Sequence, residues 1–106
     1  MTESSQVIKS PLDYLDQLME KEHLTSDYQL SKHLGVSRQL VSNWRHHRAI
    51  MDPYHCWRLA DALNIDEREI EAAANYQRDK VEKKREYWYN KWQKLADPVI
   101  TDVSPK

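Results

Sequence analysis

Residues 27–45 read DYQLSKHLGVSRQLVSNWR, and this stretch decides the fold. Gly35, the one glycine of the chain, has no Cβ and can therefore adopt the left-handed conformation that a sharp turn between two helices requires. Ser37 follows as a cap for the second helix. At helical spacing, the apolar residues that face inward on the two helices are Leu30, Leu34, Val41 and Trp44. The spacing predicts two helices that cross at the glycine and leave the outer face of the second helix free.

The composition of the whole chain limits the classes to which the protein can belong. Its 106 residues suffice for one domain with short extensions. The mean hydropathy is −0.92, no apolar run approaches the roughly 18 residues of a transmembrane helix, and Met1–Ser10 lacks the apolar core of a secretion signal, so we expect a cytoplasmic protein without a membrane span. Cys56 is the only cysteine and cannot form an intramolecular disulfide. One glycine and four prolines are too few for many short strands, which favours an all-α fold.

Capping residues and apolar periodicity divide the rest of the chain. Ser10-Pro11-Leu12-Asp13 is typical of a helix start, and Asp52-Pro53 of another. Asp66 with Glu69 resembles a capping box. The helices expected outside the central stretch are 11–23, 53–63 and one long helix over 66–96, with a possible kink near 75–80. Flexible ends are expected at 1–10 and 97–106.

The expected core follows from the same periodicity. On the first helix, apolar residues at helical spacing are Leu12, Leu15, Leu18 and Met19. On the helix over 53–63, one stripe contains Cys56, Leu59, Ala60 and Leu63, over which Ile65 is expected to close. On the long helix, one face carries Ile70, Ala74, Val81, Trp88, Trp92 and Leu95.

The central stretch resembles the XRE family, the lambda repressor and Cro-like group of phage and bacterial regulators. Residues 28–45, YQLSKHLGVSRQLVSNWR, match its helix-turn-helix motif almost position by position. The resemblance implies a five-helix DNA-binding domain over 11–65, and the extra tryptophan-bearing helix is similar to that of some short phage-related regulators. Three residues depart from the family pattern: Ser31 replaces alanine, Asp27 replaces glutamine, and His47 replaces the glycine that often ends the second helix.

The helical wheel of this motif assigns DNA-contacting roles. Arginine pairs with guanine, and glutamine or asparagine with adenine, in the major groove, whereas hydroxyls and other cations suit phosphates. The candidate base-reading residues are Arg38, Gln39, Ser42 and Asn43. The candidate phosphate-binding residues are Tyr28, Lys32, Ser37, Arg45 and Arg48. Leu40 points outward in this scheme, either as an exposed leucine or as a contact to a thymine methyl.

Charge is distributed in keeping with DNA binding. Residues 25–50 contain four basic side chains against one acidic side chain, a local charge of +3 in a chain of net charge −1. Residues 1–24 contain five acidic side chains against two lysines, so we expect them to face away from the duplex.

The residues outside the motif favour neither a metal site nor catalysis. The histidines and cysteine at His46, His47, His55 and Cys56 lack the paired spacing of a structural zinc site. No glycine-rich phosphate loop and no nucleophile flanked by a base is recognisable. We therefore expect no enzyme activity, no metal and no cofactor.

The tryptophans of the C-terminal helix allow two interpretations. They pack back onto the domain after a kink, or they pair with a second chain. The second is favoured, because a straight helix of this length extends beyond a small domain and aromatic residues are common at interfaces. The candidate interface residues are Val81, Trp88, Trp92 and Leu95.

These patterns together predict a sequence-specific, double-stranded-DNA-binding transcriptional regulator. We expect a phage- or prophage-type repressor, a homodimer that places two Ser37–Arg45 helices in major grooves about 34 Å apart on a palindromic operator. One alternative is the DNA-binding antitoxin of a toxin–antitoxin pair. Another is a protein-binding adaptor without DNA activity. A protein partner, either an antirepressor or a toxin, is compatible with the C-terminal helix.

Overall fold

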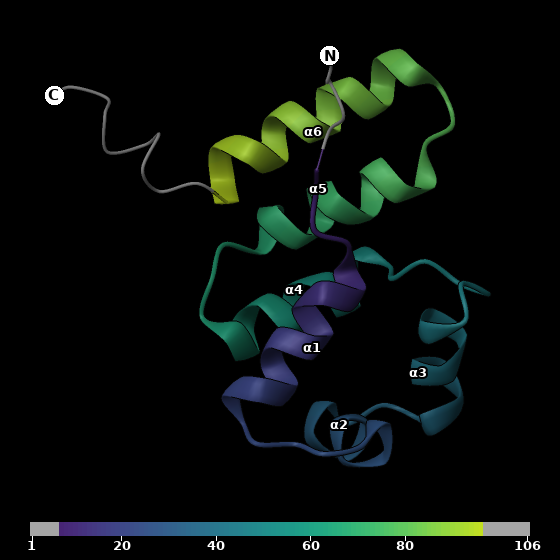
Figure 1. Cartoon of the computed structure of the whole chain (residues 1–106), viewed down its shortest axis with the longest axis vertical. Coiled ribbons are helices and arrows are strands. Elements are labelled where there is room, and N and C mark those ends of the chain that lie inside the picture. The colour runs from purple at the N-terminus through teal and green to yellow at the C-terminus, as the bar shows by residue number, and fades with distance from the viewer. Residues whose placement is uncertain (1–6, 97–106) are drawn as a thin grey trace, which may run out of the picture.

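The computed structural model describes residues 7–96, which form six α-helices and no β-strand (Figure 1). The helices are α1 (Pro11–Lys21), α2 (Asp27–Leu34), α3 (Arg38–Arg45), α4 (Pro53–Leu63), α5 (Glu67–Arg78) and α6 (Glu82–Ala96). The predicted all-α class is confirmed for this part of the chain. None of these helices is both long enough and apolar enough to cross a lipid bilayer.

The predicted flexible ends are only partly covered by the structure. Residues 1–6 and 97–106 lie outside the described residues. Within the remainder of the first segment, Lys9 is not detached from the domain: its ammonium lies 4.1 Å from the centre of the Tyr14 ring and hydrogen-bonds to Gln17. The predicted tail is therefore attached to α1 at Lys9, whereas Val7 is 79% exposed.

Most helices begin at the residues that the sequence indicates. The Ser10 hydroxyl accepts the Leu12 N–H at 3.2 Å, and the Asp13 carboxylate accepts the Ser10 N–H at 2.8 Å. The caps of the other helices are Ser26 for α2, Ser37 for α3, Asp52 for α4 and Asp66 for α5. The predicted capping box at Asp66 is incomplete, because the Glu69 side chain bonds to Tyr14 instead. A tertiary contact has replaced a local one.

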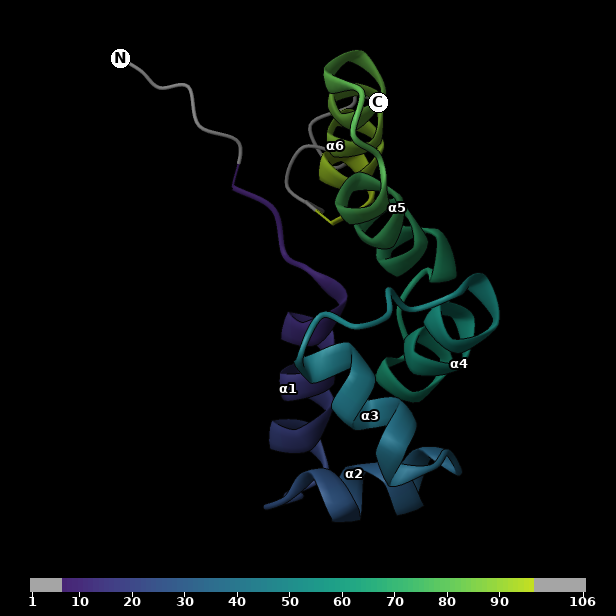
Figure 2. The same ribbon diagram turned by 90° about the vertical axis from the view of Figure 1, so that its right-hand side faces the viewer.

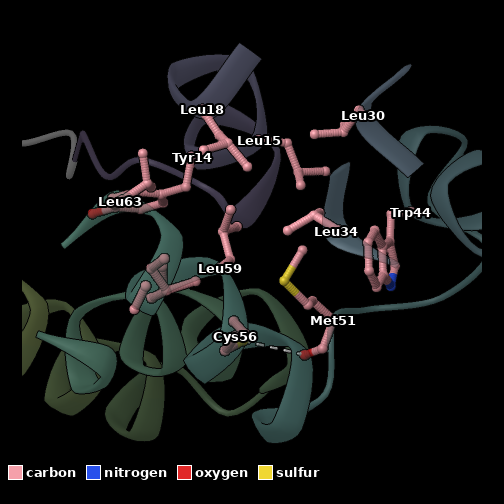
Figure 3. Close-up of a cluster of buried hydrophobic side chains, with 14 of the residues drawn as sticks. Tyr14, Leu15, Leu18, Leu30, Leu34, Trp44, Met51, Cys56, Leu59 and Leu63 are labelled. Carbon is pink, nitrogen blue, oxygen red and sulfur yellow. Dashed lines mark hydrogen bonds between the residues drawn. The ribbon is translucent and has the colours of Figure 1, made fainter. Parts of the chain in front are cut away.

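One core is formed by α1, α2, α3, α4 and α5, and Figure 3 shows part of it. Ile70 and Ala74 of α5, predicted to face inward, are among its buried residues. The predicted inward residues are buried as expected: Leu15, Leu18, Leu30, Leu34, Val41, Trp44, Cys56, Leu59, Ala60 and Leu63. Tyr14 and Met51 are also buried, although no apolar pattern indicated them. Leu40, expected to point outward, is partly buried and packs against this core. It therefore belongs to the packing of α3.

The segment over 66–96 is not one helix. The chain leaves the helical conformation at Asp79, whose backbone is extended (φ −74°, ψ 142°), and α6 then runs back antiparallel beside α5 (Figures 1 and 2). The Asp79 carboxylate accepts a hydrogen bond of 2.9 Å from the Trp88 indole, and Arg85 donates to the carbonyl of Tyr76 at 3.3 Å. These side chains of α6 hold the break. Because the helix is divided, the single apolar face predicted along it does not exist.

In the C-terminal hairpin, residues 67–96, α5 is part of the core through Ile70 and Ala74, and Trp92 joins α6 to the rest of the domain. Its indole N–H donates to the Tyr14 hydroxyl at 2.8 Å, and that hydroxyl donates to Glu69 at 2.5 Å, so α1, α5 and α6 meet at one polar cluster. Burial, together with the hydrogen bond to Glu69, raises the pKa of Tyr14 well above its usual range, and the phenol stays protonated as a donor. Trp92 thus packs within its own chain, which is the alternative that the sequence favours less.

Candidate nucleic-acid interface

The turn between α2 and α3 has the geometry predicted for it. Gly35 adopts a left-handed conformation (φ +73°), and the Val36 N–H donates to the Ser31 carbonyl at 2.9 Å. A Cβ at Gly35 would meet only the Arg58 guanidinium, at 4.0 Å, so glycine is needed for its backbone conformation and not for space. That guanidinium donates to the Leu34 carbonyl at 2.8 Å and thereby ties the turn to α4.

Two departures from the family pattern are accommodated within this unit. The Ser31 hydroxyl, which is buried, donates to the Tyr28 carbonyl one turn earlier at 2.7 Å, so its polar group is satisfied inside the helix. His47 adopts a left-handed conformation (φ +60°) just after α3 ends at Arg45. This backbone conformation is uncommon for a residue with a Cβ.

Buried residues fix the inner face of α3 and leave its polar face outward. Val41 and Trp44 are in the core, whereas Arg38 and Gln39 are exposed and Ser42 is half-buried. In Figure 1, α3 lies at the right-hand edge of the molecule, and no other helix covers its outer side. The outer face is therefore accessible along the full length of the helix.

Hydrogen bonds organise the polar side chains on this outer face. The side-chain amide oxygen of Asn43 accepts from the Gln39 amide at 3.0 Å and from Arg48 Nε at 3.1 Å. A second Arg48 nitrogen donates to the Ser42 hydroxyl at 3.0 Å. Four of the predicted DNA-contacting side chains therefore form one network.

Tyr28 lies between two cations at the start of the unit. The Arg38 guanidinium is 5.3 Å from the centre of its ring, and the Lys32 ammonium is 5.2 Å from the same point and 3.4 Å from the hydroxyl. Cation–π contacts of this kind orient the cations without neutralising them. The predicted phosphate-binding residues of α2 are thus brought beside the first turn of α3.

Arg45 is engaged within the domain, in contrast to its predicted phosphate contact. Its guanidinium forms ion pairs with Asp16 of α1 at 2.8 Å and with Asp27 of α2 at 3.1 Å. Burial alone would lower the pKa of Arg45, but the hydrogen bonds to the two carboxylates outweigh burial and raise its pKa. These pairs also neutralise Asp27, the carboxylate that would otherwise repel a phosphate. Arg45 is therefore placed to position α3.

Ser37 also has a structural role, as the N-cap of α3. Its hydroxyl oxygen accepts the Leu40 N–H at 3.0 Å and so caps α3. The hydroxyl hydrogen remains for a phosphate oxygen, in the position that a helix N-terminus offers to anions.

Three of the side chains considered as metal ligands, those of His46, His55 and Cys56, take part in packing or in hydrogen bonds near helix ends. His55 bonds to Asp52 at 2.7 Å and lies edge-on to Trp44, while Cys56 is buried and burial raises its pKa to about 12. His46 bonds to the carbonyl of Ser42 at 2.9 Å. Within residues 7–96, no group of three or more histidine, cysteine or carboxylate side chains is arranged to hold a metal ion.

The four predicted interface residues of the C-terminal segment are not brought together. Val81 is 52% exposed at the turn of the hairpin, Trp88 and Leu95 line a hollow between α5 and α6, and Trp92 points inward to Tyr14. The predicted common face depended on a continuous helix, and the break at Asp79 separates its members.

Two residues that support the candidate interface had no signal in the sequence. Arg58 caps α2 from 24 positions away, and Asp16 pairs with Arg45 across 29 positions. Both contacts arise only after α1 and α4 have packed around the α2–turn–α3 unit. No protein-family model, curated protein or solved structure matches this chain.

Proposed function

We propose that the protein is a sequence-specific double-stranded-DNA-binding transcriptional regulator of the lambda repressor-like type, with α3 as the helix that enters the major groove. The observation that carries the proposal is the outer face of α3. It presents Arg38, Gln39 and Asn43 in an organised row, on a helix whose inner face is fixed by Val41 and Trp44. An exposed polar helix on a rigid support suits the reading of base edges.

Within this proposal the side chains divide into two groups. Arg38 would pair with guanine, and Gln39, Ser42 and Asn43 would contact neighbouring bases. The exposed cations Lys32 and Arg48, with the hydroxyls of Tyr28 and Ser37, would bind phosphates on either side of the groove. We no longer assign Arg45 to the phosphate-binding residues. It supports α3 instead, because two carboxylates hold its guanidinium.

The regulatory mechanism that we propose is steric. Two copies on a palindromic operator would place their α3 helices in successive major grooves and exclude polymerase from the same DNA. The proposal requires no cofactor.

A salt titration tests whether the binding is electrostatic and centred on the proposed face. The affinity of the full chain for a fluorescent mixed-sequence duplex is measured by anisotropy at several salt concentrations. Log affinity should fall linearly with log salt, and Lys32→Glu should weaken binding and make the slope shallower by about one or more. Lys83→Glu, an equal charge reversal at an exposed lysine of α6, is the matched control.

Two outcomes of this titration would contradict the proposal. An adaptor that binds only proteins shows no measurable affinity for the duplex at low salt. If Lys83→Glu weakens binding as much as Lys32→Glu does, the DNA does not lie against the α2–turn–α3 unit, and the proposed interface is refuted.

A further inference from the structure

The C-terminal end of α3 fixes the backbone of Arg48 beside Asn43. The His47 N–H donates to the Trp44 carbonyl at 3.1 Å, and the Arg48 N–H donates to the Asn43 carbonyl at 2.8 Å. His47 has the left-handed conformation (φ +60°) that this pair of bonds, the Schellman motif, requires at the end of a helix. The motif turns the chain back on the last turn of α3, so Arg48 is held at the level of Asn43.

The side chain of Arg48 strengthens this attachment. Its Nε donates to the side-chain amide oxygen of Asn43 at 3.1 Å, and a terminal guanidinium nitrogen donates to the Ser42 hydroxyl at 3.0 Å. Within residues 7–96, no carboxylate forms an ion pair with Arg48 and competes for it. Because the guanidinium donors form a rigid fork, two bonds to neighbouring residues fix its orientation on α3.

The contact with Arg48 determines which atom of the Asn43 amide is engaged. Arginine Nε carries a hydrogen and can only donate, so the Asn43 atom that it meets must be the oxygen. The Gln39 amide nitrogen donates to the same oxygen at 3.0 Å. An amide oxygen has two lone pairs, and these two hydrogen bonds occupy both. The Asn43 oxygen therefore has no lone pair left for a base.

The amide nitrogen of Asn43 is in a different state. It donates no hydrogen bond to any residue in the part of the chain that the structure describes. The side chain is half-buried on the polar face of α3, where an N–H group without a protein partner bonds to water. In a complex with DNA, Asn43 can therefore offer hydrogen-bond donors to a base but no acceptor.

A side chain that offers only donors distinguishes between base pairs. Asparagine binds adenine through both halves of its amide, because the oxygen accepts from N6 while the nitrogen donates to N7. Guanine presents two adjacent acceptors, N7 and O6, and requires no acceptor from the protein at these atoms. An asparagine whose oxygen is occupied loses the two-bond pairing with adenine and keeps the donation to guanine.

We propose that Arg48 is a specificity-determining positioning residue, which holds the Asn43 amide so that Asn43 selects a G·C pair and not the A·T pair that its residue type indicates. The amide is held in this orientation before DNA binds. The inference rests on the proposed function, because it requires α3 to lie in the major groove. It is compatible with a phosphate contact by Arg48, whose guanidinium has N–H groups beyond the two that the network uses.

Selection from a random duplex library first locates the base pair that Asn43 reads. The full-length wild type and N43A are used in parallel, and the position sought is the one in each half-site at which N43A loses the wild-type preference. The wild type should select G·C there, in either orientation. An A·T pair at this position, or an N43A pool identical to the wild-type pool, overturns the proposal.

The role of Arg48 is then measured on two duplexes that differ only at this base pair. Anisotropy gives the dissociation constant of each, and the wild type should bind the G·C duplex about tenfold more tightly than the A·T duplex. R48A frees a lone pair of the Asn43 oxygen and allows the amide to pair with adenine, so the ratio should fall to within about twofold of one. A ratio in R48A equal to that of the wild type overturns the proposal.

K32A is the matched control, because it also removes one exposed cation that is proposed to bind phosphate. It should weaken binding to both duplexes alike and leave their ratio unchanged. If K32A changes the ratio as much as R48A does, the loss of a phosphate contact explains both variants and the positioning role of Arg48 is refuted.

The outcome is separable from that of the proposed function. A wild-type pool without any enriched sequence refutes base reading by α3, and the inference fails with it. An enriched wild-type pool together with an unchanged ratio in R48A refutes only the positioning role of Arg48 and leaves base reading in place.

Discussion

The α2–turn–α3 unit and the C-terminal hairpin are both pairs of helices joined by a short turn, but different forces hold the two turns. The first turn depends on the backbone of Gly35, which adopts a left-handed conformation and connects two helices anchored by buried residues. The second turn contains no residue of positive φ. It is held by side chains of α6 that reach back to Asp79 and Tyr76.

The two pairs also differ in which face they leave exposed. The α2–turn–α3 unit buries its apolar face and presents polar side chains, which is the arrangement expected for contact with DNA. The hairpin uses Trp92 inward and leaves Tyr87 and part of Trp88 at the surface. A polar face and an aromatic face are suited to different partners.

The largest expected difference between the two pairs concerns their tryptophans. Trp44→Ala removes a side chain that is 4% exposed and should lower the free energy of unfolding by about 3–5 kcal/mol, because the core cannot fill the cavity. Trp88→Ala removes a half-buried side chain and should cost about 1 kcal/mol. Urea unfolding followed by circular dichroism measures both. Equal losses would mean that Trp88 anchors α6 as firmly as Trp44 anchors α3.

The next effect tests how firmly the hairpin is attached. Tyr14→Phe leaves Glu69 and the Trp92 indole without their common partner and should destabilise the protein by about 1–3 kcal/mol. Tyr87→Phe removes an exposed hydroxyl that forms no hydrogen bond with the part of the chain over 7–96, and it serves as the matched control. If both phenylalanine variants unfold at the wild-type urea concentration, the polar cluster does not hold the hairpin to α1.

Substitutions in the two turns should differ by a smaller amount. Gly35→Ala should destabilise the fold by about 1–2 kcal/mol, because the added Cβ disfavours the left-handed conformation although space for it exists. Lys80→Ala, in the turn of the hairpin, should change stability by less than about 0.5 kcal/mol. A neutral Gly35→Ala would show that the first turn is not governed by its backbone.

The smallest expected effect is a dependence on pH that comes from two helix caps. Burial alone would raise the pKa of Asp52, but hydrogen bonds from His55 outweigh burial and lower it, and hydrogen bonds from Arg68 lower the pKa of Asp66. A lowered pKa in the folded state stabilises the fold above the unfolded-state pKa, and the contribution is lost as pH falls through the folded-state pKa. The melting temperature should therefore decrease as the pH is lowered below about 4.

The same experiment on variants shows whether these caps are responsible. On acidification, the melting temperature of the double variant D52N/D66N should decrease less than that of the wild type. Parallel curves for the two proteins would assign the acid sensitivity to other carboxylates.

The difference between the two turns also explains what could be predicted from the sequence. The corner at Gly35, the cap at Ser37 and the inward positions of Leu30 and Trp44 are set by residues within a few positions of one another, so a local pattern indicates them. The same pattern identified the polar row on α3, because helix periodicity fixes which side chains face outward.

The features that the sequence did not indicate depend on contacts between distant segments. The break at Asp79 has no glycine or proline and is held by Trp88 and Arg85, whose roles depend on the hairpin that they stabilise. The charge of Arg45 suggested a phosphate-binding residue. Its two carboxylate partners lie on other helices, so the sequence near Arg45 does not indicate these ion pairs. Leu40 was assigned outward by the wheel of an isolated helix and is covered once the domain packs.

The central claim is that α3 reads bases, and selection from a random duplex library tests it most directly. Full-length wild type and Arg38→Ala are each used to select duplexes at physiological salt, and the bound pools are sequenced. We predict an inverted repeat with half-sites about one helical turn apart for the wild type, and for Arg38→Ala the loss of preference at one base pair in each half-site. Unenriched pools, or an Arg38→Ala pool identical to that of the wild type, would contradict base reading by α3.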